Sequence, residues 1–179
     1  MKHAPIIILI GFMGSGKTST GKELAKEINF EFLDTDQWIE EKNKKTIAQM
    51  FKDEGEKLFR AEEKEAIRFL GGRSRLVVST GGGLWVDENN RAQLLSLGWC
   101  IWLQVSPEEA LKRVKAHPGQ RPLLAQSTDP LGDIRRLLEK RTPVYQLAHT
   151  VISTDGKDAK RVAGEILDEM KNNSLIDLV

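Results

Sequence analysis

Residues 11–18 read Gly11-Phe12-Met13-Gly14-Ser15-Gly16-Lys17-Thr18, and this stretch decides the fold of the 179-residue chain. It satisfies the pattern G-x-x-x-x-G-K-[ST] at every fixed position. The apolar run 6–10 precedes it and a helical pattern follows it, which is the strand–loop–helix context that the motif requires. Glycines in such a loop adopt backbone angles closed to other residues, so successive N–H groups converge on phosphate oxygens. The stretch therefore predicts a site for a nucleoside triphosphate.

The nucleotide contacts are expected from the loop and from the first turn of the following helix. The helix begins near Lys17 and adds the positive end of its dipole. Lys17 is expected to reach the β- and γ-phosphates, and the Thr18 hydroxyl to take a place on Mg²⁺. The residues expected to contact the nucleotide are Gly11, Met13, Gly14, Ser15, Gly16, Lys17, Thr18 and Ser19. The alternative is a glycine-rich turn that binds nothing.

Short apolar runs alternate with longer helical patterns along the rest of the chain. The runs that predict strands are 6–10, 32–33, 76–79, 100–104 and 150–153. The patterns that predict helices are 17–28, 53–70, 107–115, 131–141 and 158–171, and a capping box at 106–109 starts the third of these. Continuous apolar runs separated by helices are typical of an α/β fold with a parallel sheet between two layers of helices. Residues 35–60 and 112–126 fit this alternation poorly and are expected to form lobes over the sheet.

Length and composition predict one globular domain. The chain has 40% hydrophobic and 30% charged residues and a net charge of +1, which excludes a disordered chain and argues against a dedicated nucleic-acid-binding protein. The single cysteine, Cys100, permits no internal disulfide and lies in an apolar run typical of a buried thiol. The run 6–10 is too short to span a membrane. We expect a cytoplasmic monomer without a nucleic-acid or membrane partner.

Three further clusters suggest an acceptor for the phosphoryl group. Asp34-Thr35-Asp36 follows the second strand, where its carboxylates could face the phosphates or cap a helix. Ser79-Thr80-Gly81-Gly82-Gly83 follows the third strand and brings the backbone close to a ligand, or forms a plain turn. Arg60, Arg121 and Arg141 suit charge neutralisation at a transferred phosphoryl group, although a solvated basic face explains them too.

In their order along the chain, these clusters resemble the shikimate kinase family. The resemblance covers residues 5–154, nearly the whole chain. The motifs that carry it, after the phosphate loop, are Phe32-Leu33-Asp34-Thr35-Asp36, Phe59-Arg60-Ala61-Glu62-Glu63, Ser79-Thr80-Gly81-Gly82-Gly83, Arg121-Pro122-Leu123-Leu124 and Arg141-Thr142-Pro143-Val144-Tyr145. The resemblance implies a P-loop kinase fold with a five-stranded parallel sheet. It also implies a single domain over residues 1–179, with a substrate-binding lobe at about 34–61 and a mobile lid at about 112–126.

The resemblance further implies a reaction. The γ-phosphoryl group of ATP passes to the 3-hydroxyl of shikimate, with Mg²⁺ as cofactor, in chorismate and aromatic amino-acid biosynthesis. Lys17, Asp36 and Arg121 match the catalytic residues of the family. Among them, Asp36 is the candidate proton acceptor, although a loose transition state asks little of a base. Arg121 matches the lid arginine that closes over the phosphates.

Other residues match binding positions of the family. Asp34 matches the residue that holds Mg²⁺ together with Thr18. Arg60 and Arg141 match the pair that grips the shikimate carboxylate, which suits planar guanidinium groups. Gly82 and Gly83 match positions whose backbone approaches the substrate hydroxyls.

Several assignments stay open at this stage. Phe51 and Phe59 could wall the pocket for the acceptor ring or pack a helix core, and Arg113 is only a weak candidate for contact with adenine. A gluconate-type or other small-molecule kinase would share the loop and the lid arginine but would not explain all the acceptor motifs together. A non-catalytic ATP-binding module would be expected to lose Lys17, Asp36 or Arg121, and all three are present.

Overall fold

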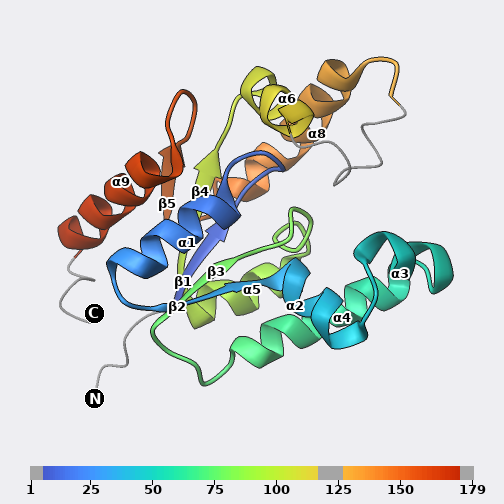
Figure 1. Cartoon of the computed structure of the whole chain (residues 1–179), viewed down its shortest axis with the longest axis horizontal. Helices are drawn as coiled ribbons and strands as arrows, with labels where there is room; N and C mark the ends of the chain where they lie inside the picture. The colour runs from blue at the N-terminus through green and yellow to red at the C-terminus, as the bar shows by residue number, and fades with distance from the viewer. Residues whose placement is uncertain (1–5, 117–126, 174–179) are drawn as a thin grey trace.

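The computed structural model of the chain describes residues 6–116 and 127–173. Thirteen elements lie in this part of the chain, and Figure 1 shows their arrangement. In chain order they are β1 (Ile6–Ile10), α1 (Lys17–Glu27), β2 (Glu31–Asp34), α2 (Thr35–Asn43), α3 (Ile47–Asp53), α4 (Glu56–Leu70), β3 (Leu76–Ser79), α5 (Glu88–Leu97), β4 (Gly98–Gln104), α6 (Pro107–Ala116), α8 (Pro130–Tyr145), β5 (Thr150–Ser153) and α9 (Ala159–Asn172). No helix in the described ranges is long and apolar enough to cross a membrane.

The five strands form one parallel sheet in the order β2-β3-β1-β4-β5, so all five predicted strands are confirmed. β1 lies at the centre of the sheet. Every residue of β1 and every residue of β3 is buried. The two edge strands, β2 and β5, are partly exposed. The chain moves outward from β1 to β2 on one side and returns across β1 to β4 on the other. A sheet of this kind binds ligands at the carboxyl ends of its strands, near such a reversal.

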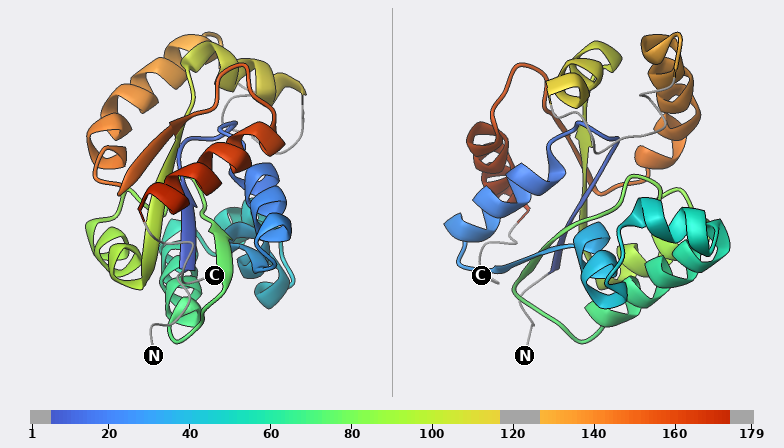
Figure 2. Two further views of the ribbon diagram at one scale, coloured as in Figure 1. Left: turned by 90° about the vertical axis from the view of Figure 1, so that its left-hand side faces the viewer. Right: turned by 45° about the vertical axis from the view of Figure 1, so that its right-hand side comes forward.

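Two layers of helices cover the sheet (Figure 2). Ile7 and Leu9 of β1 point to the layer of α1 and α9, whereas Ile6, Ile8 and Ile10 point to the layer of α4, α5 and α8. Cys100 is fully buried in the second layer, and burial raises the pKa of its thiol to about 12. A thiol that stays protonated at neutral pH is a poor nucleophile, which agrees with the expected inert cysteine.

A third, smaller core joins α2, α3 and α4, in the region expected to form the substrate-binding lobe. Its buried members are Ile39, Met50, Phe59 and Ala66. Phe51 is 40% exposed and its ring lies 4.9 Å from that of Phe59, so only Phe59 belongs to the core. The last turn of α4 packs against the sheet layer, so this helix runs from the lobe into the main body.

The helix expected over 53–70 is α4, which begins three residues later, at Glu56. α3 ends at Asp53 and α4 begins at Glu56, because Gly55 between them has φ 82°. A residue in this left-handed region breaks the run of α-helical angles. The helical pattern therefore placed only its first residues, from Asp53 to Gly55, on the wrong side of this break.

Two further local expectations need correction. α5 (Glu88–Leu97) has no predicted counterpart, because only Asn90 and Leu94 of it are buried and the sequence lacks an apolar stripe. The capping box at 106–109 is half formed: the Glu109 N–H donates to Ser106 Oγ at 3.3 Å, but the Ser106 N–H donates to Asp155 at 2.9 Å. A residue 49 positions away has replaced the expected partner at this helix start.

Candidate active site

The candidate site lies where the carboxyl ends of β1, β2 and β3 meet. In the sheet register Ser79 pairs with Leu9 on one side and with Asp34 on the other. The segments that follow these strands are the phosphate loop, the Asp34-Thr35-Asp36 cluster and the triple glycine at 81–83. The parallel order of the strands therefore brings the nucleotide motif and two of the acceptor motifs to one edge of the sheet.

The phosphate loop requires glycine for two separate reasons. Gly11 has φ 145°, and a Cβ there would lie 2.5 Å from the carbonyl oxygen of Leu103 on β4. Gly14 and Gly16 have φ 75° and 84°, in the left-handed region. The loop is closed by the Ser15 N–H, which donates to the Phe12 carbonyl oxygen at 3.2 Å. A side chain at Gly11 would force the loop off the sheet, and with it the start of α1.

Lys17 is held inside this loop. Its side chain is 8% exposed, and Nζ donates to the carbonyl oxygens of Gly11 at 3.0 Å and Phe12 at 2.9 Å. The helix start at Gly16 has no side-chain cap. The hydroxyl oxygen of buried Ser15 has no hydrogen-bond partner among the described residues. A buried ammonium, an uncapped helix start and a hydroxyl without a partner together fit the oxygens of a polyphosphate.

The other residues expected to bind nucleotide have less to offer through their side chains. Met13 packs against the core beside β1, so its backbone is the part available to a ligand. Ser19 is exposed in the first turn of α1.

Side-chain oxygen atoms from three elements lie close together at Thr18. The Thr18 hydroxyl donates to Asp34 Oδ2 at 2.8 Å and lies 3.4 Å from Ser79 Oγ. Asp34 Oδ1 accepts from the backbone N–H of Asp36 at 3.0 Å and of Gln37 at 3.3 Å. Asp34 therefore caps α2 with one oxygen and accepts from Thr18 of the phosphate loop with the other, so the cap is confirmed and the role at the phosphates stays a prediction.

The side-chain oxygen atoms around Thr18 suit Mg²⁺ as a ligand set. This ion prefers oxygen ligands and keeps several of its waters, so it needs only one or two protein groups. In the described ranges no group of three or more His, Cys, Asp and Glu side chains is arranged to hold a metal. The few oxygens at Thr18, Asp34 and Ser79 are thus suited to a hydrated Mg²⁺ that the phosphates also bind, rather than to an all-protein metal site.

Asp36 lies against the first glycine of the triple-glycine segment. The Gly81 N–H donates to Thr35 Oγ1 at 2.9 Å, which fixes the segment beside the start of α2. A Cβ on Gly81 would lie only 2.3 Å from Asp36 Oδ1. Position 81 must therefore be glycine if the Asp36 carboxylate is to keep its place.

This contact predicts that Gly81→Ala lowers kcat about tenfold or more while the fold survives, because small displacements of a reacting group are costly. The clash is with the end of a side chain, which can move, so we expect little change in Tm. Steady-state kinetics and thermal unfolding measure both. Gly164→Ala on α9 is the matched control, since a Cβ there has open space and should leave kcat unchanged. Full turnover in Gly81→Ala would show that the position of Asp36 is unimportant.

Both arginines expected to bind one carboxylate lie against the same glycines. Arg141 Nη1 donates to the Gly82 carbonyl oxygen at 3.0 Å. A Cβ on Gly83 would lie 3.1 Å from Arg60 Nη1. Arg60 comes from α4 and Arg141 from α8, 81 positions apart in sequence, so only the tertiary fold brings them to one loop.

Arg60 is held by Glu63, for which the sequence predicted no role. Arg60 Nη1 donates to Glu63 Oε2 at 2.8 Å, and its Nη2 donates to the exposed Glu56 at 2.8 Å. Glu63 is 1% exposed, and burial raises the pKa of its carboxyl although Arg60 opposes this rise. Glu63 follows Arg60 by three residues on one helix, and this spacing in Phe59-Arg60-Ala61-Glu62-Glu63 could have identified the pair.

Arg113 joins three parts of the structure rather than standing free beside the nucleotide. Its Nη1 donates to the Gly14 carbonyl oxygen at 3.1 Å, its Nη2 to the Thr154 carbonyl oxygen at 2.6 Å, and its Nε to Glu109 at 2.8 Å. It thereby ties α6 to the phosphate loop and to the segment after β5. Arg121 and positions 117–126 of the expected lid lie outside the described residues, and positions 112–116 form the end of α6.

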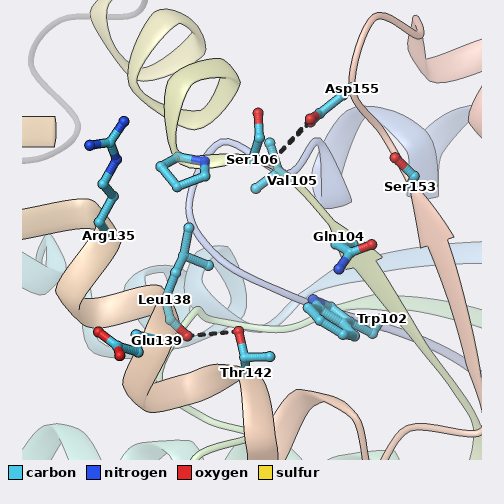
Figure 3. Close-up of a pocket in the computed structure, with 11 residues that line it drawn as sticks. Trp102, Gln104, Val105, Ser106, Arg135, Leu138, Glu139, Thr142, Ser153 and Asp155 are labelled. Atoms are coloured by element: carbon cyan, nitrogen blue, oxygen red, sulfur yellow. Dashed lines mark hydrogen bonds between the residues drawn. The ribbon is translucent and has the colours of Figure 1, made fainter. Parts of the chain in front are cut away.

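A hollow of about 510 Å³ lies apart from these residues, between α8 and the ends of β4 and β5. Figure 3 shows Trp102 and Gln104 on one side of it and Leu138 and Thr142 of α8 on the other. None of the residues expected to bind nucleotide, metal or acceptor lines it. The hollow is therefore distinct from the candidate site.

Comparison with known proteins agrees with this geometry. The family model for shikimate kinase matches residues 13–171. A shikimate kinase of Thermus thermophilus is 44% identical over 169 residues, covering 94% of this chain and 91% of the relative. One from Moorella thermoacetica is 44% identical over 165 residues, covering 92% of this chain and 94% of the relative. The solved structure of the Acinetobacter baumannii shikimate kinase in complex with shikimate superposes with a TM-score of 0.87 at 37% identity, covering 94% of each chain. The chain therefore belongs to the shikimate kinase family.

Proposed function

We propose that this chain transfers the γ-phosphoryl group of ATP to the 3-hydroxyl of shikimate at the site described above, giving shikimate 3-phosphate. Family membership supports a shikimate kinase activity that uses ATP. The observation that carries the assignment of the site is the position of Gly82. A Cβ there would lie 4.0 Å from both the Gly11 oxygen and the Met13 nitrogen, and its own carbonyl binds Arg141. One glycine thus lies beside the phosphate loop and is hydrogen-bonded to an acceptor arginine.

On the nucleotide side, Lys17 and the loop N–H groups bind the β- and γ-phosphates. The ammonium of Lys17 is already held within the loop by two carbonyl oxygens, so little rearrangement is needed for it to face the transferred group. Thr18 and Asp34 would hold Mg²⁺, Asp34 through water. When bound, this ion neutralises charge on the phosphates.

On the acceptor side, Arg60 and Arg141 bind the carboxylate of shikimate and the backbone at Gly82 and Gly83 binds its hydroxyls. Asp36 receives the proton of the reacting hydroxyl. Arg60 would keep the buried Glu63 and exchange its exposed partner Glu56 for the ligand, since an exposed ion pair contributes little stability. Arg121 is assigned to the transferred phosphoryl group on its sequence motif alone.

Arg60→Ala should raise the KM for shikimate about tenfold or more and leave the KM for ATP unchanged, because of the two substrates only the acceptor would lose charged hydrogen bonds. Steady-state kinetics with each substrate varied in turn measures the effect. Arg68→Ala is the matched control, an arginine on the same helix that pairs with Glu65 at the surface. An unchanged shikimate KM in Arg60→Ala would reject the assigned role.

The proposed reaction is tested by ADP release from MgATP with shikimate, with gluconate, or with no acceptor. Release that depends on shikimate supports the proposal. Release with gluconate alone would keep the phosphate site but overturn the roles of Asp36, Arg60 and Arg141. No release despite ATP binding would favour a non-catalytic nucleotide-binding module. Size-exclusion chromatography tests the monomeric state that we also propose.

A further inference from the structure

The carbonyl oxygen of Gly82 accepts two hydrogen bonds from the end of α8. One comes from Arg141 Nη1 at 3.0 Å and the other from the Tyr145 hydroxyl at 3.2 Å. Tyr145 is fully buried, and its ring stacks on Trp102 with centroids 5.7 Å apart and an interplanar angle of 28°. A buried ring with a stacked neighbour has little freedom, so its hydroxyl is delivered to one place.

The two hydrogen bonds fix the orientation of a whole peptide group. The Gly82 carbonyl and the Gly83 N–H belong to one planar trans peptide, in which the oxygen and the hydrogen point in opposite directions. With its oxygen held against α8, this peptide must direct the Gly83 N–H away from α8. Among the described residues nothing accepts a hydrogen bond from the N–H of Gly82 or of Gly83. Both donors are thus available for a ligand beside Arg60.

The surroundings keep the Tyr145 hydroxyl a donor and keep the two segments together. Burial raises the pKa of the Tyr145 phenol, although nearby Arg141 lowers it in part, so the hydroxyl stays protonated at neutral pH. A further hydrogen bond runs from the segment after the glycines to α8: Trp85 Nε1 donates to the Val144 carbonyl oxygen at 2.7 Å. The glycine segment and the end of α8 therefore hold each other through side chains from both partners.

We infer that Tyr145 is a positioning residue for the acceptor: its hydroxyl, without touching shikimate, aims the Gly82–Gly83 peptide at the substrate hydroxyls. It also steadies Arg141, because it fixes the carbonyl oxygen to which Arg141 donates. Without the phenol, Arg141 alone would hold that oxygen, and Arg141 must also bind the substrate carboxylate. This inference rests on the proposed function of the site.

The test is Tyr145→Phe, which keeps the ring and its stacking on Trp102 and removes only the hydroxyl. Loss of one neutral hydrogen bond is expected to raise the shikimate KM about five- to tenfold, with the KM for ATP unchanged. Thr142→Val is the matched control on the same helix. It removes a hydroxyl that donates to the Leu138 carbonyl oxygen at 2.8 Å, beside the separate hollow in Figure 3. We expect both KM values of this control to stay at wild-type levels.

Three outcomes would overturn the inference. A change of less than about twofold in the shikimate KM of Tyr145→Phe would show that the hydroxyl does not orient the peptide. Equal rises in the KM for shikimate and the KM for ATP in Tyr145→Phe would indicate a general structural role. A rise in the shikimate KM of Thr142→Val as large as that of Tyr145→Phe would indicate the same. If the wild-type protein does not phosphorylate shikimate, the proposed function fails first. The two failures are therefore distinguishable.

Discussion

Lys17→Ala is expected to lower kcat about 100-fold or more, because it removes a positive charge that faces the transferred phosphoryl group. Two features of the structure make the effect large. The ammonium is buried, so water cannot replace its charge, and two loop carbonyls hold it in place before any ligand arrives. A preorganised charge in a site with little water contributes most to stabilising a transition state. Single-turnover and steady-state kinetics with saturating shikimate measure the loss.

Lys26→Ala is the matched control for this experiment. Lys26 is an exposed lysine in the last turn of the same helix, at the end remote from the loop. Its replacement should leave kcat within experimental error. A Lys17→Ala variant with more than about a tenth of wild-type turnover would remove Lys17 from the catalytic residues.

Asp36→Asn is expected to lower kcat about 100-fold, the lower end of what a general base contributes. The amide matches the carboxylate in shape but cannot accept the proton of the reacting hydroxyl. Its neighbours at Gly81 and at the start of α2 are unchanged, so the KM for shikimate should change much less than kcat. The contrast with Arg60→Ala, where the KM for shikimate is expected to rise, would separate proton transfer from binding.

Near-normal turnover in Asp36→Asn would rule out an obligatory proton acceptor at this position. A loose, dissociative transition state allows that outcome, since the hydroxyl can then lose its proton late. The pH dependence of kcat gives an independent measure. In the wild-type protein kcat should fall at low pH as the base takes up a proton, and this fall should be absent from Asp36→Asn.

Sequence motifs located most of the candidate site because each one is local. The phosphate loop, the carboxylate cluster and the triple glycine each follow a buried strand directly. The parallel sheet places the carboxyl ends of β1, β2 and β3 together, so recognising three strands was enough to group the motifs. At Asp34 the two interpretations, cap and site, do not exclude each other, because one carboxylate oxygen caps α2 and the other accepts from Thr18.

Elements without a local pattern were missed. α5 buries too few apolar residues to show a period, and Gly55 makes α4 begin three residues later than the helical pattern predicted. At Ser106 the sequence predicted the partner three residues away, whereas Asp155 binds the backbone nitrogen instead. In each case a contact or a backbone angle, not a propensity, decided the outcome.

The fold class, the five strands, the phosphate loop and the resemblance to shikimate kinases could all be predicted from sequence motifs, because these features depend on residues adjacent in the chain. How the acceptor residues are held could not be predicted in this way. Asp36 lies against Gly81, Arg60 of α4 lies against Gly83, and Tyr145 reaches Gly82 from 63 positions away. Contacts over such separations follow from the packing of helices on the sheet, and packing has no pattern in any short stretch of sequence.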